Sequence, residues 1–332
     1  MRLVKKIYVI KSKMNKILIT GSSGFIGSNL LQFYEDKGFI VANIDKSHPK
    51  REEYSKNWRK INILDYDSFE SEILSFQPNI VIHLAARTDL NGNNLNDYAS
   101  NTIGTQNLIK ILNKTQSVKR VIFTSSMLVC KPGYIPKNMN DYASSTPYGE
   151  SKVLMEKFIR ESLHNYEWTI VRPTSIWGPW FGEPYRNFFE MLINKRYFHT
   201  GEKSCIKTYG YIGNLIYQVD SILNAPAEKI HREVFYLGDY VPTDIHKWAD
   251  EIASEMGIKI KTIPFPLIIF AAKGGDVLKL FGINFPMTSF RLKNMTTNNI
   301  VNLSNIKDIA PDLPFSRSDG IKLTLNWLKN SK

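Results

Sequence analysis

Residues 17–31 read "ILITGSSGFIGSNLL", and this stretch is the strongest indication of the fold in the sequence. An apolar run ends at Gly21, and Gly24 and Gly27 follow at the spacing Gly-x-x-Gly-x-x-Gly before an amphipathic stretch begins. Glycines at this spacing let a backbone turn tightly after a strand, approach a pyrophosphate and pack the next helix on the sheet. The helix N-terminus also favours phosphate charge. We therefore expect a dinucleotide-binding turn here rather than a glycine-rich turn without a ligand.

Short apolar runs alternate with longer amphipathic stretches from this point to about Arg172, which is typical of βαβ units. The runs are almost continuously hydrophobic, as in parallel strands covered on both faces. The pattern predicts an α/β protein with a doubly wound, Rossmann-type parallel sheet. We expect strands at 16–20, 39–45, 61–63, 79–86, 120–126 and 168–173, and helices at roughly 25–37, 66–76, 95–114 and 147–165.

The pattern loosens after Arg172 into loops rich in Trp, Pro and Gly, such as "IWGPWFGEPYRNFF" at 176–189. This second half predicts a smaller, mixed α/β lobe that shapes a substrate pocket at the carboxyl ends of the strands. Met14 directly precedes the first strand, so residues 1–13 are interpreted as an extension. We expect a dinucleotide-binding domain at 14–176 and about 205–238, and a substrate-binding lobe at 177–204 and 239–332.

Composition narrows the class of protein further. At 332 residues and 43% hydrophobic content, the chain is large enough to bury a full core. The longest apolar run, "IPFPLIIFAA" at 263–272, is about half the ~20 residues of a membrane span. We therefore expect no stable membrane insertion, and a buried helix rather than contact with a membrane surface.

Cysteine, histidine and charge add weaker constraints. Only Cys130 and Cys205 are present, which favours a reducing, cytoplasmic location over a disulfide framework. The histidines are scattered and have no metal-ligand spacing, so no metal site is expected. A net charge of +12 suits an anionic substrate such as a nucleotide diphosphate, but the charge is dispersed and no nucleic-acid motif accompanies it.

The second expected strand ends in Asp45, where a carboxylate can accept hydrogen bonds from both hydroxyls of an adenosine ribose. A 2′-phosphate would be repelled there, so NAD is favoured over NADP. Lys46 and Lys50 weaken this preference. Without a cofactor, Asp45 would be only a turn former at the end of a strand.

These residues and several later motifs resemble the extended short-chain dehydrogenase/reductase family, whose best-known members modify nucleotide sugars. The resemblance covers most of 16–330 and is strongest in the first 180 residues. It places "HLAAR" (83–87) under the pyrophosphate and Asn62 at the adenine, where the family usually has Asp. His83 is expected to be a packed strand residue. The implied cofactor-binding residues are Gly21, Gly24, Phe25, Ile26, Gly27, Asp45, Asn62, Ile63, Leu84, Ala85, Ala86, Arg87, Asn101, Tyr148, Lys152 and Thr174.

The stretch "STPYGESK" at 145–152 puts Tyr148 and Lys152 on one face of a helix. A phenol with a pKa near ~10 needs roughly 3 units of lowering, about 4 kcal/mol, to act as a base at neutral pH. A lysine ammonium and an oxidised nicotinamide ring are suitable sources. By resemblance, Tyr148 is the general acid/base, Lys152 tunes it and anchors the nicotinamide ribose, and Ser126 in "TSSMLV" bonds the substrate oxygen. Taken alone, the stretch is better explained by a surface helix that starts at Pro147 and carries an ordinary Tyr and Lys.

The resemblance implies hydride transfer from a carbinol carbon to NAD. Dehydratases of the family carry an Asp-Glu pair after the catalytic residue, whereas this chain has Met127 and Leu128, so dehydration is disfavoured. We expect a nucleotide-sugar epimerase serving surface polysaccharide synthesis, with C4 as the first candidate for the reacting carbon. The segment 265–294 also resembles hydroxysteroid-dehydrogenase-like relatives, which keeps a net dehydrogenase or reductase as the alternative. The third hypothesis, a scaffold without turnover, conflicts with the intact Ser, Tyr and Lys.

Residues of the substrate side follow the family pattern less closely. Lys207 stands where the family has a phosphate-gripping Arg, and Ser175 where it has Asn. The expected substrate-binding residues are Ser126, Ser175, Arg186, Lys207 and Arg291, although Arg186 and Arg291 could instead form surface ion pairs. Family members commonly form homodimers through the helices corresponding to 95–114 and 147–165, and we expect the same of this chain.

Overall fold

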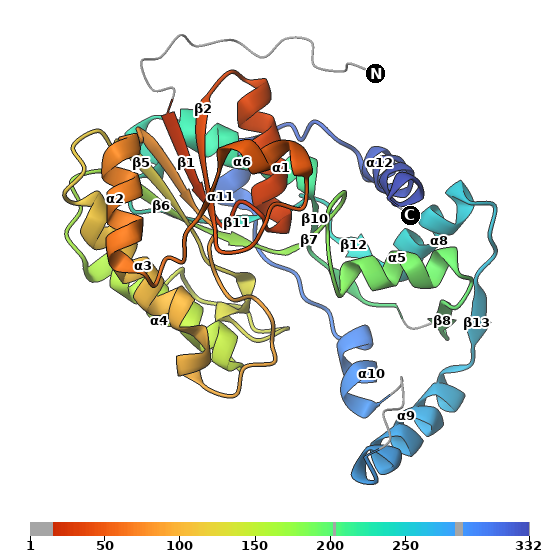
Figure 1. Ribbon diagram of the computed structural model, residues 1–332. Helices are drawn as coiled ribbons and strands as arrows, with labels where there is room; N and C mark the ends of the chain where they lie inside the picture. Colours follow the sequence, from red (N-terminus) through yellow and green to blue (C-terminus); the bar gives the residue numbers. More distant parts are fainter. Residues whose placement is uncertain (1–15, 202–203, 283–287, 332) are drawn as a thin grey trace.

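The structure is a computed structural model that describes residues 16–201, 204–282 and 288–331, so the expected extension at 1–13 lies outside the described residues. Seven strands form one parallel sheet: Lys16–Thr20 (β1), Ile40–Asp45 (β2), Trp58–Lys60 (β3), Ile80–His83 (β4), Arg120–Thr124 (β5), Glu167–Pro173 (β6) and Val234–Leu237 (β11). Their order is β11-β6-β5-β4-β1-β2-β3 (Figure 1). The order reverses between β1 and β4, which confirms the expected Rossmann-type sheet and marks the place where such sheets bind ligands.

Helices cover both faces of the sheet (Figure 1). On one face lie Tyr66–Phe76 (α2), Ala99–Leu112 (α3) and Pro147–Glu161 (α4), and on the other lie Phe25–Asp36 (α1) and Ile212–Asn224 (α6). Successive residues of β1 serve opposite faces, because side chains alternate along a strand. Ile17 and Ile19 are buried beside α1 and α6, while Leu18 is buried beneath α2 and α3. Two apolar layers therefore fix the sheet in place.

Several expected elements have different bounds in the structure. The strand expected at 61–63 is wrong: β3 lies at Trp58–Lys60, and 61–63 follow its carboxyl end. It is a short edge strand whose residues are half-buried or exposed, so no apolar run marks it. The expected helix 95–114 begins with a 3-10 turn at Leu95–Tyr98 (η2). The strands expected to reach residues 86 and 126 stop at His83 and Thr124, which leaves "LAAR" and "SS" as loops at the carboxyl edge.

The remaining elements are short and belong mostly to the second half of the chain. They are Glu52–Asn57 (η1), Met127–Val129 (η3), Ser175–Trp177 (β7), Tyr185–Ile193 (α5), Phe198–Thr200 (β8), Ile206–Lys207 (β9), Tyr209–Tyr211 (β10), Ala227–Ile230 (α7), Thr243–Asp244 (β12), Ile245–Glu255 (α8), Lys261–Ile263 (β13), Phe265–Leu280 (α9), Ser289–Thr296 (α10), Ser304–Lys307 (α11) and Arg317–Asn330 (α12). Strands pair as β10-β7, β12-β9 and β13-β8. Trp177 and Trp248 pack with ring centroids 5.1 Å apart and hold α8 against β7.

The apolar run 263–272 contradicts the expectation of a buried helix. It opens α9, in which Ile268 and Ala272 are buried while Leu267 and Phe270 are 61% and 80% exposed. The helix is apolar around most of its circumference, and the protein covers only one side of it. Figure 1 shows α9 and α10 projecting beyond the rest of the molecule. Among the helices that the structure describes, none has the length and apolar character needed to cross a bilayer.

Candidate active site

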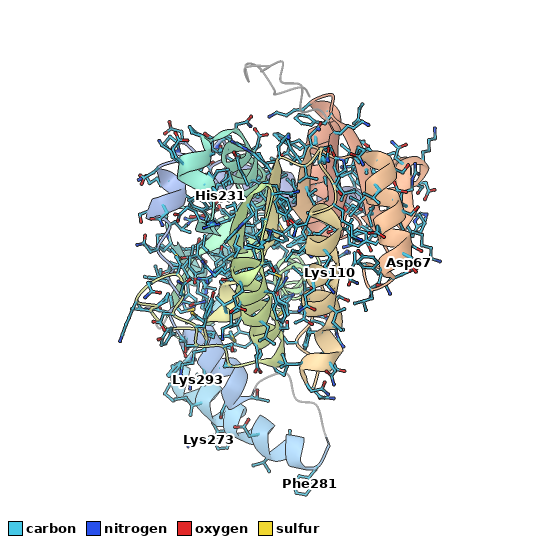
Figure 2. The ribbon with its side chains drawn as sticks, turned by 90° about the vertical axis from the view of Figure 1, so that its left-hand side faces the viewer. Asp67, Lys110, His231, Lys273, Phe281 and Lys293 are labelled. Atoms are coloured by element: carbon cyan, nitrogen blue, oxygen red, sulfur yellow. The ribbon has the colours of Figure 1, made fainter. Side chains whose placement is uncertain are left out.

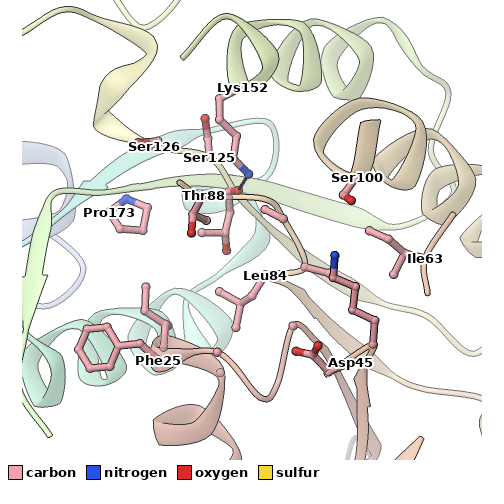
Figure 3. Close-up of a pocket in the computed structure, with 18 of the residues that line it drawn as sticks. Phe25, Asp45, Ile63, Leu84, Thr88, Ser100, Ser125, Ser126, Lys152 and Pro173 are labelled. Carbon is pink, nitrogen blue, oxygen red and sulfur yellow. Dashed lines mark hydrogen bonds between the residues drawn. The ribbon is translucent and has the colours of Figure 1, made fainter. Parts of the chain in front are cut away.

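A pocket of about 340 Å³ lies at the carboxyl edge of the sheet and runs from Asp45 to Ser126 and Lys152 (Figure 3). It occupies the point where the strand order reverses. Most of the residues expected at the cofactor line it: Gly21, Gly24, Phe25, Ile26, Gly27, Asp45, Asn62, Ile63, Leu84, Ala85, Ala86, Tyr148, Lys152 and Thr174. The expected cofactor and catalytic positions are thus brought together in one cavity.

The glycine loop forms one wall of this pocket. Gly21 has a φ of +73°, which favours glycine, and a Cβ there would lie 2.6 Å from the Ala85 nitrogen. A Cβ at Gly27 would collide with the carbonyl oxygen of Gly21. Helix α1 begins at Phe25, so its N-terminal end, with unpaired backbone N–H groups, opens on the pocket. The loop has the shape and polarity that a pyrophosphate needs.

Asp45 ends β2 at the far end of the pocket. Its Oδ2 accepts a hydrogen bond from the Ser23 nitrogen at 3.1 Å, and its Oδ1 accepts one from the Ser47 nitrogen at 2.8 Å. Burial raises the pKa of this carboxyl group, and the two backbone hydrogen bonds oppose that shift. Nearby, the Oδ1 of Asn62 accepts from the Leu64 nitrogen at 3.1 Å and caps a turn. The carboxylate is therefore held in place before any ligand arrives.

Tyr148 is positioned by the first turn of α4. Thr146 caps this helix by accepting a hydrogen bond from the Gly149 nitrogen at 3.0 Å, and Pro147 occupies its first position. The Tyr148 side chain is 6% exposed and is hydrogen-bonded to Ser126. Burial raises the pKa of Tyr148 to about 12, and the bond with Ser126 opposes this. The shift is opposite in sign to the lowering that a catalytic base requires, because burial disfavours the charged phenolate.

Lys152 lies one turn further along α4 and is buried. Its Nζ donates to the Thr124 carbonyl oxygen at 2.8 Å (Figure 3), and the Met155 sulfur lies 3.6 Å away. Burial lowers the pKa of Lys152 to about 8, and the negative charge of Glu156 opposes this shift. The ammonium group is thus tied to the end of β5, at the pocket wall.

A buried network behind the pocket was missed by sequence reasoning. Glu156 is fully buried and accepts from the Ser125 hydroxyl at 2.6 Å, from Arg172 Nε at 2.8 Å and from the Tyr142 hydroxyl at 3.0 Å. Arg172 is also fully buried and pairs with Glu156 at 2.7 Å. The network joins α4 to the ends of β5 and β6. Its signals in the sequence were a charge four residues after Lys152 and an arginine ending a buried strand.

Two residues expected at the cofactor lie outside the pocket lining. Arg87 pairs with Asp89 at 2.8 Å and donates to the Asp97 carbonyl oxygen at 3.1 Å. Asn101 is fully buried, and its Nδ2 donates to the Arg87 carbonyl oxygen and to Ser151 at 2.9 Å, so it clamps the loop after β4 to α4. Sequence reasoning also missed lining residues that neighbour its motifs: Lys46, Ile61, Thr88, Ser100, Thr124, Ser125 and Pro173.

The residues expected at the substrate are more scattered. Ser175 is buried in β7 and hydrogen-bonded to Tyr185, while Arg186 pairs with Glu190 at 2.7 Å, as in the ion-pair alternative. Lys207 lies in β9, where its backbone forms a bridge with Asn299. The Asn299 amide lies 3.9 Å from the Met127 sulfur, next to Ser126. The side chain of Arg291 lies outside the described residues; its backbone belongs to α10.

The residues of the pocket fit a nicotinamide dinucleotide. The glycine loop leaves room for a pyrophosphate, Asp45 faces the ribose end, and the hydroxyl of Thr124 is buried on the pocket wall without a hydrogen-bond partner within the described protein. His83 is packed in the core between Thr20 and Thr105, at 2.8 and 3.1 Å. Burial lowers the pKa of His83 to about 3, so it stays neutral behind the pocket.

Comparisons with known proteins show the family of the chain. A model of the NAD dependent epimerase/dehydratase family matches residues 17–238. The N-acetyl-alpha-D-glucosaminyl-diphospho-ditrans,octacis-undecaprenol 4-epimerase of Escherichia coli O157:H7 is 24% identical over 94% of this chain and 95% of its own. The 3 beta-hydroxysteroid dehydrogenase/Delta 5-->4-isomerase of Mycobacterium tuberculosis is 24% identical over 75% of this chain and 71% of its own.

The fold is also shared with solved structures. The UDP-glucuronic acid 4-epimerase of Bacillus cereus, in complex with UDP-glucuronic acid and NAD, superposes with a TM-score of 0.74 at 18% identity. That match covers 96% of this chain and 100% of the Bacillus chain. The family match shows that the cofactor is NAD. It also confirms the resemblance to the extended short-chain dehydrogenase/reductase family. The chain is an enzyme of the NAD dependent epimerase/dehydratase family.

Proposed function

We propose that this protein is a 4-epimerase of a sugar joined to a diphosphate. The observation that carries the proposal is the placement of Ser126, Tyr148 and Lys152 at one end of a pocket whose other end is the glycine loop and Asp45. When bound, NAD supplies a positively charged ring that accepts a hydride from the sugar carbon and can return it. The residues of the chain then have to move one proton and hold one oxygen.

Tyr148 is the group that moves the proton. With its pKa at about 12, the phenol stays protonated at neutral pH. It becomes a base only when a nearby positive charge lowers that pKa. Lys152, held beside the pocket by the Thr124 carbonyl oxygen, is one source of that charge. Ser126 shares a hydrogen bond with Tyr148 and can bond the same substrate oxygen. In an epimerase the proton goes back to that oxygen, so no group is consumed.

Epimerisation is favoured over dehydration by the loop after β5. An elimination needs carboxyl groups next to the reacting carbon, and this loop offers Met127 and Leu128. Retention of NAD through the cycle also fits epimerisation, since the hydride returns to the sugar. The 24% identity to an epimerase along nearly the whole chain supports the same reaction class.

The substrate class is a diphosphate sugar, with a nucleotide as the first candidate for the group beyond the diphosphate. The relative from Escherichia coli adds a polyprenol as the second candidate, because its name places the sugar on diphospho-undecaprenol. Both serve the assembly of surface polysaccharides. We also propose a homodimer through α3 and α4, and a cytoplasmic location.

The decisive experiment incubates the purified protein, without added cofactor, with UDP-, GDP-, CDP- and dTDP-sugars and with a polyprenyl-diphosphate-linked N-acetylhexosamine. Interconversion of C4 epimers is expected with at least one of them. If no C4 epimer forms and, once NAD is supplied, NADH accumulates in stoichiometric amount with an oxidised sugar, the chain is a net dehydrogenase, the reaction class named for the relative from Mycobacterium tuberculosis.

A further inference from the structure

The least explained part of the described surface is α9 with its neighbour α10. Five positions, Leu267, Phe270, Gly274, Val277 and Phe281, recur at three- and four-residue spacing and lie on one side of the helical segment. The four large side chains among them are 61%, 80%, 54% and 76% exposed. The opposite side, with Ile268 and Ala272, is buried against the protein. An exposed apolar stripe of this size marks an interaction site.

The charge around the stripe is one-sided. In sequence, residues 265–297 contain four basic residues and a single acid, Asp276. Of the basic residues, Lys273 and Lys293 are exposed among the described side chains. The carboxylate of Asp276 accepts a hydrogen bond from the Ser289 nitrogen at 3.1 Å and so joins α9 to α10. Figure 2 shows Lys273, Phe281 and Lys293 at the same end of the molecule, opposite His231.

We propose that α9 and α10 form a docking surface for the face of an anionic lipid bilayer. Phenylalanine and leucine on one side of a helix, with lysines beside them, are the composition that lies in a membrane interface. At 16 residues α9 is shorter than the ~20 residues a span needs, so it would lie in the plane of the interface. Basic residues complement the negative lipid headgroups.

A second copy of the chain is a poorer occupant of the stripe. A twofold pairing brings the same patch of both subunits together. The basic residues of α9 and α10 in one subunit would then meet those of the other, and like charges in an interface oppose association. A bilayer offers apolar depth for the stripe and negative charge for the lysines at the same time.

The docking surface is connected to the substrate side of the pocket. The segment after α10 is held to the loop after β5, since the Gly133 nitrogen donates to Asn299 Oδ1 at 3.2 Å and the Asn299 amide lies 3.9 Å from the Met127 sulfur. Met127 follows Ser126 directly. The segment that follows α10 therefore links the docking surface to the loop that carries Ser126. The proposal concerns membrane binding and stands whether the sugar is carried by a nucleotide or by a polyprenol.

The test is flotation of the full chain with vesicles of phosphatidylcholine that contain about one quarter phosphatidylglycerol. We expect the wild type to float with these vesicles and to bind pure phosphatidylcholine less. The variant F270S/F281S should bind about tenfold more weakly, because it loses the two aromatic side chains that would insert into the bilayer. K273E/K293E should lose about fivefold per lysine, and this loss should shrink at high salt. The matched control is L163S, which removes a side chain that is 90% exposed but lies away from α9.

Three results would overturn the proposal. One is a wild type that floats with neither vesicle, and another is an F270S/F281S variant that binds like the wild type. The third is a wild-type dimer that becomes monomeric in F270S/F281S without any vesicle binding, which would assign the stripe to a second copy. Circular dichroism of each variant checks the fold. Epimerisation of a water-soluble substrate should be unchanged in all of them, so failure of docking and failure of the proposed function remain separate outcomes.

Discussion

The cofactor half of the pocket is built on one sheet, whereas the substrate half is assembled from segments far apart in the chain. Gly21, Asp45 and Ala85 stand at the ends of parallel strands whose register fixes their spacing. On the substrate side, β9 pairs with β12 and contacts the segment at Asn299, which in turn touches Met127. This fold can therefore keep its cofactor half while its substrate half changes. If the two halves are separable, a substitution in one should leave the other unaffected.

The largest effect is expected from Tyr148→Phe. Loss of the phenolic proton should lower turnover by about 10⁴-fold, near the upper limit for one proton-transfer group. The ring remains to fill its buried position, so NAD content should be unchanged. Turnover on the true substrate and NAD released from the denatured protein measure the two effects. Tyr217→Phe, on α6, is the matched control. Full activity of Tyr148→Phe would leave this tyrosine as the capped start of a surface helix and nothing more.

The second effect is on stability and comes from Glu156→Ala. This change leaves the fully buried guanidinium of Arg172 without its carboxylate, and removing one partner of a buried pair costs about 3 kcal/mol or more. Urea unfolding should show this loss in the free energy of unfolding. Glu190→Ala breaks the pair with Arg186, whose partners are 41% and 42% exposed, and should change stability little. Equal losses in both variants would mean that the buried network does not brace the cofactor half.

The buried network around Glu156 is a part of the structure that the sequence could not predict. The glycine loop, Asp45 and the sheet order follow from local patterns, because backbone geometry ties each motif to the strand before it. Glu156 and Arg172 are sixteen residues apart and belong to a helix and a strand, so only the folded structure brings them together. For the same reason Asn101 could be matched to a motif but not recognised as a clamp on Ser151.

The sequence did not predict the exposure of α9, for a different reason. An apolar run predicts burial, and Ile268 follows that prediction. Whether the protein covers one side of a helix or both depends on its neighbours, and composition carries no information about them. Arg186 was ambiguous in the sequence, and in the structure it pairs with Glu190 at 2.7 Å.

The third prediction uses the pKa of Lys152. A lysine whose pKa is lowered to about 8 carries its ammonium charge below that pH and loses it as the pH rises through it. If Lys152 anchors the cofactor, NAD retained after gel filtration should fall by about tenfold for each pH unit above that value. Glu156 raises this pKa, so Glu156→Gln should move the fall to lower pH. If NAD retention does not change with pH in either the wild type or Glu156→Gln, Lys152 does not anchor the cofactor.

The smallest effect is expected on the substrate side, from Lys207→Met. Lys207 stands in β9, where its backbone pairs with Asn299, and the Asn299 amide lies 3.9 Å from the Met127 sulfur, next to Ser126. If it binds the diphosphate, its loss should raise KM about fivefold, as expected for one charge-assisted hydrogen bond in a solvent-accessible site, with kcat and NAD content unchanged. Arg186→Met is the control, because its guanidinium is already paired with Glu190. A fall in NAD content in Lys207→Met would show that the two halves are coupled after all, since β9 would then support the cofactor through the Asn299 segment. An unchanged KM would instead move the diphosphate to a different group, and the separation of the two halves would stand.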